Sequence, residues 1–204
     1  HLERVQERLE REFGQAIIMT APTVQYRFLL KNGEKITVDN PLYYPDPAQI
    51  QHSEEPFVRI SIIIPERYMG AVMKLCTDRR GVNPRFHYPT PGRIEINFDM
   101  PLAEIIYNFY DRLKTITQGY GSFDYEFLDY RESNLVKVDI LINHEKVDAL
   151  STIVHRDNAR QRALNICERL KEEIPRQMFK VIIQGAIGGT IIARSTISAY
   201  RKDV

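Results

Sequence analysis

The sequence predicts an α+β fold: tandem ferredoxin-like (split βαβ) domains followed by a small α/β C-terminal domain. Three observations favour this class. Hydrophobic residues make up 43% of the 204 residues, with 11 Tyr and 9 Phe, enough to form buried cores. The middle of the chain has the order strand, helix, two strands, helix, strand. The last third places one amphipathic helix between pairs of β-rich runs.

The first segment, residues 1–53, is predicted to begin with a helix over residues 1–13, ended by Gly14. Strands follow over 15–20, 23–30 and 34–39, and Asn32-Gly33 favours a hairpin between the last two. The first helical pattern starts without a capping residue, and a last one breaks off at Val204. These ends predict that the chain is part of a longer protein.

A proline-punctuated loop over 40–47 and a polar linker over 52–56 separate this segment from the next. The second segment, residues 54–133, has a strand at 57–64 and a helix opened by Pro65. Two strands across Pro89 to Gly92, a single helix opened by Pro101 and a last strand complete the βαββαβ order. The predicted ranges of these later elements are 82–88, 93–98, 102–113 and 122–130.

The third segment, residues 134–204, starts with strands 135–142 and 147–154, paired across Asn143-His144. A basic helix over 157–174, capped by Asp157, follows and ends at Pro175. Short strands at 179–184 and 190–193 flank a glycine turn, and Ser195 is predicted to cap a final helix. The apolar face of the basic helix comprises Ala159, Ala163, Ile166, Cys167 and Leu170.

Charge is unevenly distributed along the chain. Residues 135–204 carry 12 Lys and Arg against 8 Asp and Glu, a net charge of +4, while the rest is net −3. An anionic partner for the last third is therefore indicated.

Several classes of protein and site lack their sequence signatures. No apolar run is long enough to span a membrane, and the charged start is not a signal peptide. Cys76 and Cys167 have no metal-site spacing and fit buried thiols in a reducing cytosol. No nucleotide-binding lysine loop is present. The glycines of residues 184–190 could cradle a phosphate, but a tight turn explains them better.

Basic residues are the candidate site. Arg79 and Arg80 end a helix, where positive charge also complements the helix dipole. Arg156, Arg160 and Arg162 crowd a helix start, the unfavourable end for cations, which suggests an external phosphate. The alternative is a solvated face with no partner. The remaining candidates in the last third are Arg176, Arg194, Arg201 and Lys202.

Sequence motifs at residues 1–13, 20–24, 55–56, 109–114 and 119–125, among others, resemble those of the bacterial LepA (elongation factor 4) family of translational GTPases. Residues 1–13 and 20–24 are similar to domain III of elongation factor G, and residues 54–133 to its domain V. What separates LepA from elongation factor G is a C-terminal domain, which is resembled by residues 147–151, 155–157, 174–177, 186–189, 191–194 and 201–204. The resemblance thus implies a partial domain III at 1–53, a domain-V-like domain at 54–133 and a truncated LepA-type domain at 134–204.

By this resemblance, the chain supplies surface for the ribosome (rRNA and ribosomal proteins) and for tRNA. The family acts in translocation, including back-translocation, and in fidelity under stress. The chain itself is expected to be a monomer with no enzyme activity and no cofactor, while GTP and Mg²⁺ belong to the longer protein. The expected location is the cytoplasm, with peripheral association with the inner face of the cell membrane and an organellar homologue as alternatives.

Three alternatives remain open at this point. The first is a fragment of an elongation-factor-G-like translocase. The second is a small phosphate-binding enzyme of acylphosphatase-like architecture, and the third is a regulatory or oligomerisation module. The enzyme alternative requires an arginine in a phosphate loop near an acid or base, which the spacing of the residues does not provide.

Overall fold

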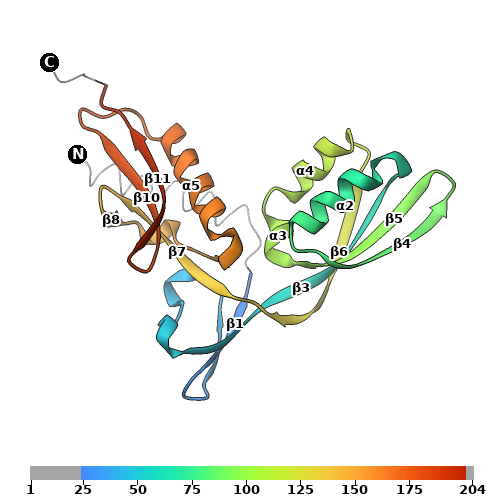
Figure 1. Cartoon of the computed structure of the whole chain (residues 1–204), viewed down its shortest axis with the longest axis horizontal. Helices are drawn as coiled ribbons and strands as arrows, with labels where there is room; N and C mark the ends of the chain where they lie inside the picture. Colours follow the sequence, from blue (N-terminus) through green and yellow to red (C-terminus); the bar gives the residue numbers. More distant parts are fainter. Residues whose placement is uncertain (1–23, 201–204) are drawn as a thin grey trace. The chain divides into compact units, whose positions relative to one another are not determined.

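The computed structural model describes residues 24–200, and Figure 1 shows their arrangement. They form two compact units. Residues 24–28 and 52–132 make up the central unit, and residues 29–51 and 133–200 make up the C-terminal unit. The predicted helix at 1–13 and strand at 15–20 lie outside the described residues, as do Arg201 and Lys202. The division into segments 1–53, 54–133 and 134–204 stays a prediction.

Antiparallel strand pairs form the central sheet. Its strands are β1 (Tyr26–Leu30), β2 (Lys35–Val38), β3 (Ile50–Pro65), β4 (Val82–Thr90), β5 (Arg93–Pro101) and β6 (Ser122–Glu132). They run in the order β2-β1-β3-β5-β4, and β6 also pairs with β3. The predicted turn joins β1 to β2: Gly33 has φ +88°, and the Asn32 side chain accepts a hydrogen bond from Glu34 N at 2.9 Å.

The linker predicted at residues 52–56 is wrong, because β3 runs through it without a break. The backbone of this polar run pairs with β6, where Glu54 lies opposite Glu132 and Glu55 lies opposite Arg131. The polarity of this run suggested a loop. Partners supplied by a strand far along the chain make it a strand instead.

Three helices cover one face of β3, β5 and β6 (Figure 1): α2 (Met69–Asp78), α3 (Leu102–Ile106) and α4 (Phe109–Ile116). A short 3₁₀ turn, Glu66–Tyr68, precedes α2. Alternate residues of β3 and β5 are fully buried beneath the helices, as are Val72 and Cys76 of α2. The predicted βαββαβ order is therefore found between β3 and β6.

The single helix predicted over 102–113 is wrong. It breaks at Tyr107-Asn108, where Asn108 has φ +63° and Tyr107 is extended. Asparagine tolerates this left-handed backbone better than most residues. Ile105 before the break and Phe109 after it are both buried in the same core.

The C-terminal unit has a second sheet, in the order β11-β10-β7-β8, with β9 also on β7. Its strands are β7 (Leu135–Ile142), β8 (Glu145–Lys146), β9 (Thr152–His155), β10 (Val181–Ile187) and β11 (Thr190–Ile197). One helix, α5 (Ala159–Glu173), packs against it (Figure 1). The 3₁₀ turns are Pro41–Tyr43, Pro47–Gln49, Asp148–Leu150 and Arg156–Asn158.

Two predictions for this unit need correction. The strand expected over 147–154 is shortened: the turn Asp148–Leu150 occupies its start and buries Leu150, and only β9, from Thr152 onward, pairs with β7. Ser195 caps no helix. It lies in β11 and donates a hydrogen bond to Glu168 Oε1 on α5 at 2.8 Å. The predicted turn at Asn143-His144 is found, with both residues at positive φ.

Helix α5 sits close to the sheet because the contact surface is made of small side chains. Ala159, Ala163, Cys167 and Leu170 are buried, as predicted, and Ile166 is half-buried. A Cβ added at Gly185 of β10 would lie 2.7 Å from the Ala163 Cβ. Both cysteines are buried free thiols, as expected, and burial raises the pKa of Cys167 to about 11.

Candidate nucleic-acid interface

The start of α5 gathers the first group of basic residues. The chain enters the helix through the turn Arg156–Asn158, and Arg160 is the second residue of α5. Asp157, the predicted cap, does not cap α5 with its side chain. Instead, its backbone N–H donates a hydrogen bond to His155 Nδ1 at 3.1 Å. The first turn of α5 contains no acidic residue. Cations therefore stand where the helix dipole is positive, an arrangement that costs stability.

Arg156 and Arg160 are exposed, and neither makes an ion pair or a side-chain hydrogen bond within residues 24–200. The charge of Arg156 reaches Tyr44. Burial raises the pKa of that hydroxyl, and Arg156 opposes the shift. Arg162 is half-buried, contrary to the expectation that it would be as exposed as Arg160. Of the three arginines predicted at this helix start, only Arg156 and Arg160 are therefore exposed.

The far end of α5 carries a second group. Arg176 and Lys180 are exposed in the connector between α5 and β10, again with no ion pair among the described residues. Residues 174–202 contain five Lys and Arg and no Asp or Glu. Lys180 was missed in the sequence analysis, although this carboxylate-free run could have pointed to it.

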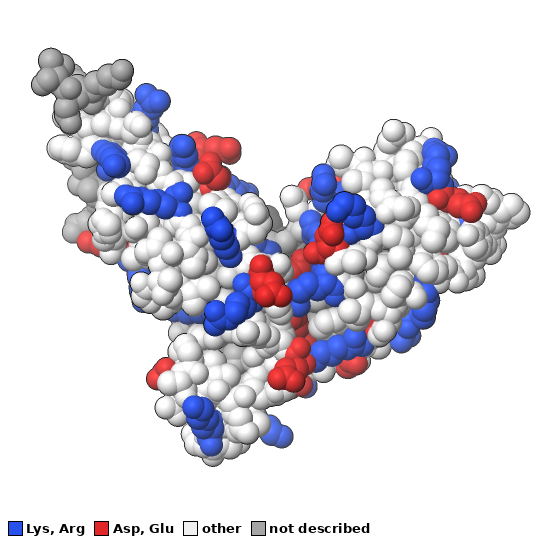
Figure 2. Space-filling model, in the orientation of Figure 1, with Lys and Arg blue, Asp and Glu red and all other residues white. Residues whose placement is uncertain are grey.

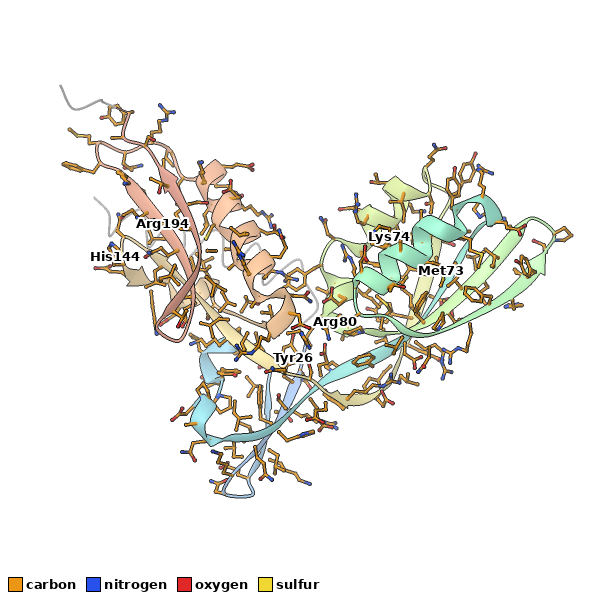
Figure 3. All side chains as sticks on the ribbon, in the orientation of Figure 1. Tyr26, Met73, Lys74, Arg80, His144 and Arg194 are labelled. Carbon is orange, nitrogen blue, oxygen red and sulfur yellow. The ribbon has the colours of Figure 1, made fainter. Side chains whose placement is uncertain are left out.

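Arg194 lies on β11, and Figure 3 labels it on the β10–β11 hairpin. Its neighbour Ser195 bonds to α5, and successive side chains of a strand point to opposite faces. Arg194 therefore points away from α5. Its side chain lies on the same face of the sheet as that of its cross-strand partner Gln184. It is exposed and unpaired within the described residues.

These cations do not converge on one point. Arg160 and Arg176 lie at opposite ends of α5, whose 15 residues span about 22 Å at ~1.5 Å per residue. In Figure 2, Lys and Arg are spread over this unit, with few Asp and Glu between them. Such a distribution suits contact with an extended polyanion better than capture of one small phosphate.

Arg79 and Arg80 are placed differently, in the central unit. Arg79 Nη1 donates to the Glu104 carbonyl at 2.8 Å and to the Tyr107 carbonyl, holding the end of α3. Arg80, labelled in Figure 3, binds both carboxylate oxygens of buried Glu55 at 2.9 and 3.0 Å and Glu104 Oε1 at 3.3 Å. Burial lowers the pKa of Arg80, but the two carboxylates outweigh it and the net shift is upward. Both arginines are committed to internal partners.

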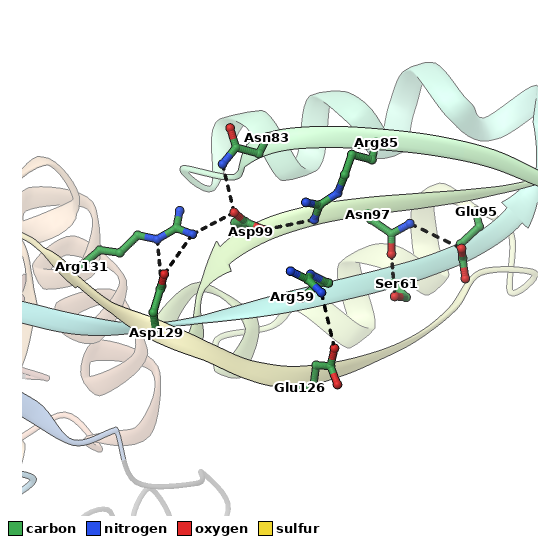
Figure 4. Close-up of polar contacts among 10 residues, drawn as sticks. All are labelled: Arg59, Ser61, Asn83, Arg85, Glu95, Asn97, Asp99, Glu126, Asp129 and Arg131. Carbon is green, nitrogen blue, oxygen red and sulfur yellow. Dashed lines mark hydrogen bonds and ion pairs between the residues drawn. The ribbon is translucent and has the colours of Figure 1, made fainter.

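The sheet face opposite the helices carries a second polar network that the sequence did not reveal (Figure 4). Asp99 accepts hydrogen bonds from Asn83, Arg85 and Arg131 at 3.0, 3.1 and 2.9 Å. Burial raises the pKa of Asp99, but these donors outweigh it and leave the pKa below its usual value. Arg131 also bonds Asp129 at 2.9 Å. The charges of this face neutralise one another.

Of Phe123, Tyr125 and Phe127 on β6, only Phe123 packs against the core. That ring is half-buried and meets Phe109 edge to face, with centroids 5.0 Å apart. Tyr125 and Phe127 are exposed, because β6 lies at the edge of the helix-covered face.

The glycine segment 184–190 does not form a phosphate cradle. Gly185 lies within β10 against Ala163, and Gly188 turns the chain between β10 and β11 at φ +59°. These residues therefore do not fit GTP. Across residues 24–200 there is no cluster of three or more His, Cys, Asp or Glu that could hold a metal ion. No helix in that range is long and apolar enough to cross a bilayer.

Comparison with known proteins places these two units in a family. Residues 52–141 match the family model "Elongation factor G C-terminus", and residues 142–204 match "GTP-binding protein LepA C-terminus". Elongation factor 4 of Syntrophobacter fumaroxidans is 69% identical over all 204 residues, and that of Syntrophus aciditrophicus is 65% identical. The chain belongs to the elongation factor 4 (LepA) family.

The chain spans 34% of the length of each of these two relatives. The LepA-specific match at 142–204 includes four arginines that are exposed and unpaired within the described residues: Arg156, Arg160, Arg176 and Arg194. It also separates the elongation factor 4 family from an elongation-factor-G-like alternative. A crystal structure from Thermus thermophilus is 27% identical over 40% of this chain and 12% of that chain, with a TM-score of 0.37. A score of this size establishes no shared fold.

Proposed function

We propose that this chain is the ribosome- and tRNA-contacting part of a LepA-type translational GTPase, and that its C-terminal unit binds RNA phosphates. The observation that carries the proposal is that Arg156, Arg160, Arg176 and Arg194 are exposed and unpaired within the described residues. Exposed cations without partners are free to neutralise phosphates.

The proposed contact set differs from the sequence-based one. Arg79 and Arg80 leave it because their guanidinium groups already hold the central unit together. Lys180 joins it. Arg201 and Lys202, outside the described residues, stay in it as sequence-based candidates, and half-buried Arg162 is kept only as a neighbour of Arg160.

The longer protein would hydrolyse GTP, with Mg²⁺ bound alongside it, and the described residues would add binding surface. Back-translocation, translation fidelity and a cytoplasmic location belong to the same proposal, as do the tandem ferredoxin-like fold and the domain-III-like nature of residues 1–53. The relatives' name, elongation factor 4, and the family description "GTP-binding protein" support the parental activity.

The test compares two double variants of the whole chain for binding to purified bacterial ribosomes and to tRNA. Arg156→Glu with Arg160→Glu reverses unpaired cations of the C-terminal unit. Lys74→Glu with Arg93→Glu reverses exposed charges of the central unit and serves as the control. The first pair should weaken binding. It should also make the slope of log K against log salt less negative by at least about 1.4, since each lost phosphate contact removes about 0.7–0.9 from the magnitude of that slope.

The control pair should leave the affinity and the slope near those of the unmodified chain. If both pairs behave alike, or if neither changes the salt slope, the arginines are only a solvated surface and the proposal fails.

The small-enzyme alternative is tested separately. Calorimetric titration of the chain with Mg²⁺–GTP should detect no binding of micromolar or tighter affinity. The reason is that residues 184–190 pack as a hairpin and not as a phosphate loop. Micromolar affinity would instead favour a phosphate-binding site.

A further inference from the structure

The connector between α5 and β10 is held firmly in place. It starts after Ile174 and ends before Val181, both buried in the core of the C-terminal unit. Ile174 N donates to the Leu170 carbonyl at 2.8 Å. In its middle, Gln177 accepts a hydrogen bond from Tyr200 N at 3.1 Å and donates one to the Pro175 carbonyl at 2.8 Å. The connector is therefore a non-helical segment that is attached to the core at both ends and to Tyr200 in its middle.

This fixed backbone displays an apolar tip to solvent. Phe179 is 76% exposed and its neighbour Met178 is 58% exposed. Tyr200, tied to the connector through Gln177, is 53% exposed. Phe179 is the most exposed of the large apolar side chains among the described residues, which makes it available to a ligand.

The surroundings of the tip are cationic. Arg176 and Lys180 flank it, both exposed and unpaired within the described residues. No carboxylate occurs from residue 174 to residue 202, and the nearest one before it is Glu173, at the end of α5. A partner that suits this tip must combine negative charge with a flat apolar surface. An unpaired nucleotide has both, in its phosphate and its base.

We infer that the connector binds an unpaired nucleotide of RNA, with the Phe179 ring stacked on the base and Arg176 and Lys180 at the adjacent phosphates. The inference rests on the proposed RNA-binding function and adds to it. Phosphate contacts alone do not distinguish paired from unpaired RNA, whereas a stacking ring favours a base that is free of its helix.

An anionic lipid surface would also meet cations and apolar side chains, but the connector suits it less well. Peripheral binding to membranes grows with the apolar area buried, which an amphipathic helix supplies along its whole length. Here the apolar group comprises only Met178, Phe179 and Tyr200, none of which lies in a helix. A single ring between two cations is instead the arrangement that stacks on bases.

The experiment uses the whole chain and two RNA probes. One is a hairpin with a four-nucleotide loop that carries the fluorescent base 2-aminopurine, and the other is a fully paired duplex of equal length. Phe179→Ala should weaken hairpin binding by about 5- to 150-fold, the effect of losing one stacked base, and leave duplex binding nearly unchanged. Quenching of 2-aminopurine by the bound chain should disappear.

Matched variants separate stacking from hydrophobicity and from general damage. Phe179→Tyr keeps a ring and should retain hairpin affinity and quenching, whereas Phe179→Leu keeps only apolar surface and should lose both. Tyr43→Ala is the control: Tyr43 is 73% exposed in the same unit but stands between Asp39 and Asp46, so its removal should change neither probe.

Two results would overturn the inference while the proposed function stands. One is salt-dependent binding of both RNAs that Phe179→Ala does not change. The other is binding to phosphatidylglycerol vesicles that Phe179→Ala abolishes while hairpin binding persists, which would assign the tip to lipid. If the unmodified chain binds neither RNA nor ribosomes, the proposed function itself fails.

Discussion

The two units of this chain differ in where their most buried ion pairs and their candidate RNA-binding arginines lie. In the central unit, Arg80 is clamped by Glu55 and Glu104, and Asp99 is held by Arg85 and Arg131. In the C-terminal unit, several arginines are exposed with no partner within the described residues. Net charge alone would not reveal this contrast.

The contrast separates two roles for an arginine that look identical in a sequence. A guanidinium group with buried carboxylate partners stabilises the fold, and removing it strands a charge. A guanidinium group in solvent contributes little to stability and is available to a ligand. Substitutions in the two units should therefore affect different measurements.

The largest effect is expected for Arg80→Met. Glu55 is buried, with its side chain 1% exposed, and both its oxygens depend on Arg80. Stranding that carboxylate should lower the free energy of unfolding by about 3 kcal/mol or more. Urea denaturation of the whole chain, followed by circular dichroism, measures it. The double variant Arg80→Met, Glu55→Gln should recover part of the loss; no recovery would show that the two side chains are not coupled.

A smaller loss, about 1–3 kcal/mol at pH 7, is expected for Asp99→Asn, because this buried side chain loses its charged hydrogen bonds to Arg85 and Arg131. The pH dependence sharpens this prediction. The folded-state pKa of Asp99 lies below its ordinary value of 3.8, so the unfolded chain binds more protons in acid.

The stability that Asp99 contributes is therefore present above about pH 4 and is lost as the pH falls through the folded-state pKa. Denaturation midpoints measured from pH 7 to pH 3 should fall less steeply in Asp99→Asn than in the unmodified chain. Parallel curves would show that another carboxylate governs the acid limb.

Arg160→Glu should change stability in the other direction. This residue lies in the first turn of α5, where a negative charge complements the helix dipole. We expect a gain of about 0.3–1 kcal/mol in the free energy of unfolding together with weaker RNA binding. A variant that is both less stable and weaker in binding would contradict the separation of roles, since Arg160 would then be structural.

The smallest effect is expected for Lys74→Ala in the central unit. Lys74 and Asp78 form an ion pair at 2.8 Å, but their side chains are 77% and 60% exposed. Removal should cost less than about 0.5 kcal/mol in urea denaturation. A loss as large as that of Asp99→Asn would mean that pairing, and not burial, makes a charge structural in this unit.

Much of the fold could be read from local patterns. Turn signals located the hairpin at Asn32-Gly33 and the turn at Asn143-His144, and helical spacing located the buried faces of α2 and α5. The errors share one cause. The polar start of β3, the break at Asn108 and the interrupted strand before β9 each depend on contacts with segments far along the chain.

The candidate site shows the same division. The sequence alone established the charge excess of the last third, the family resemblance and the arginines as candidates. The sequence distinguished Arg79 and Arg80 from Arg156 and Arg160 only by the end of the helix at which each pair stands. The sequence gives the charge of a side chain but does not show which carboxylates other strands bring close to it.

What the sequence determined was the order of the elements and the sign of their charges, because strand alternation, helical spacing and turn chemistry act over a few residues. What only the tertiary structure decided was which charges are neutralised and which are left to solvent. Glu55 reaches Arg80 from 25 residues away, and Arg131 reaches Asp99 from 32. The energy of an ion pair depends on the distance between its two charges in space and not on their separation along the chain. Only the folded chain therefore assigns the partners.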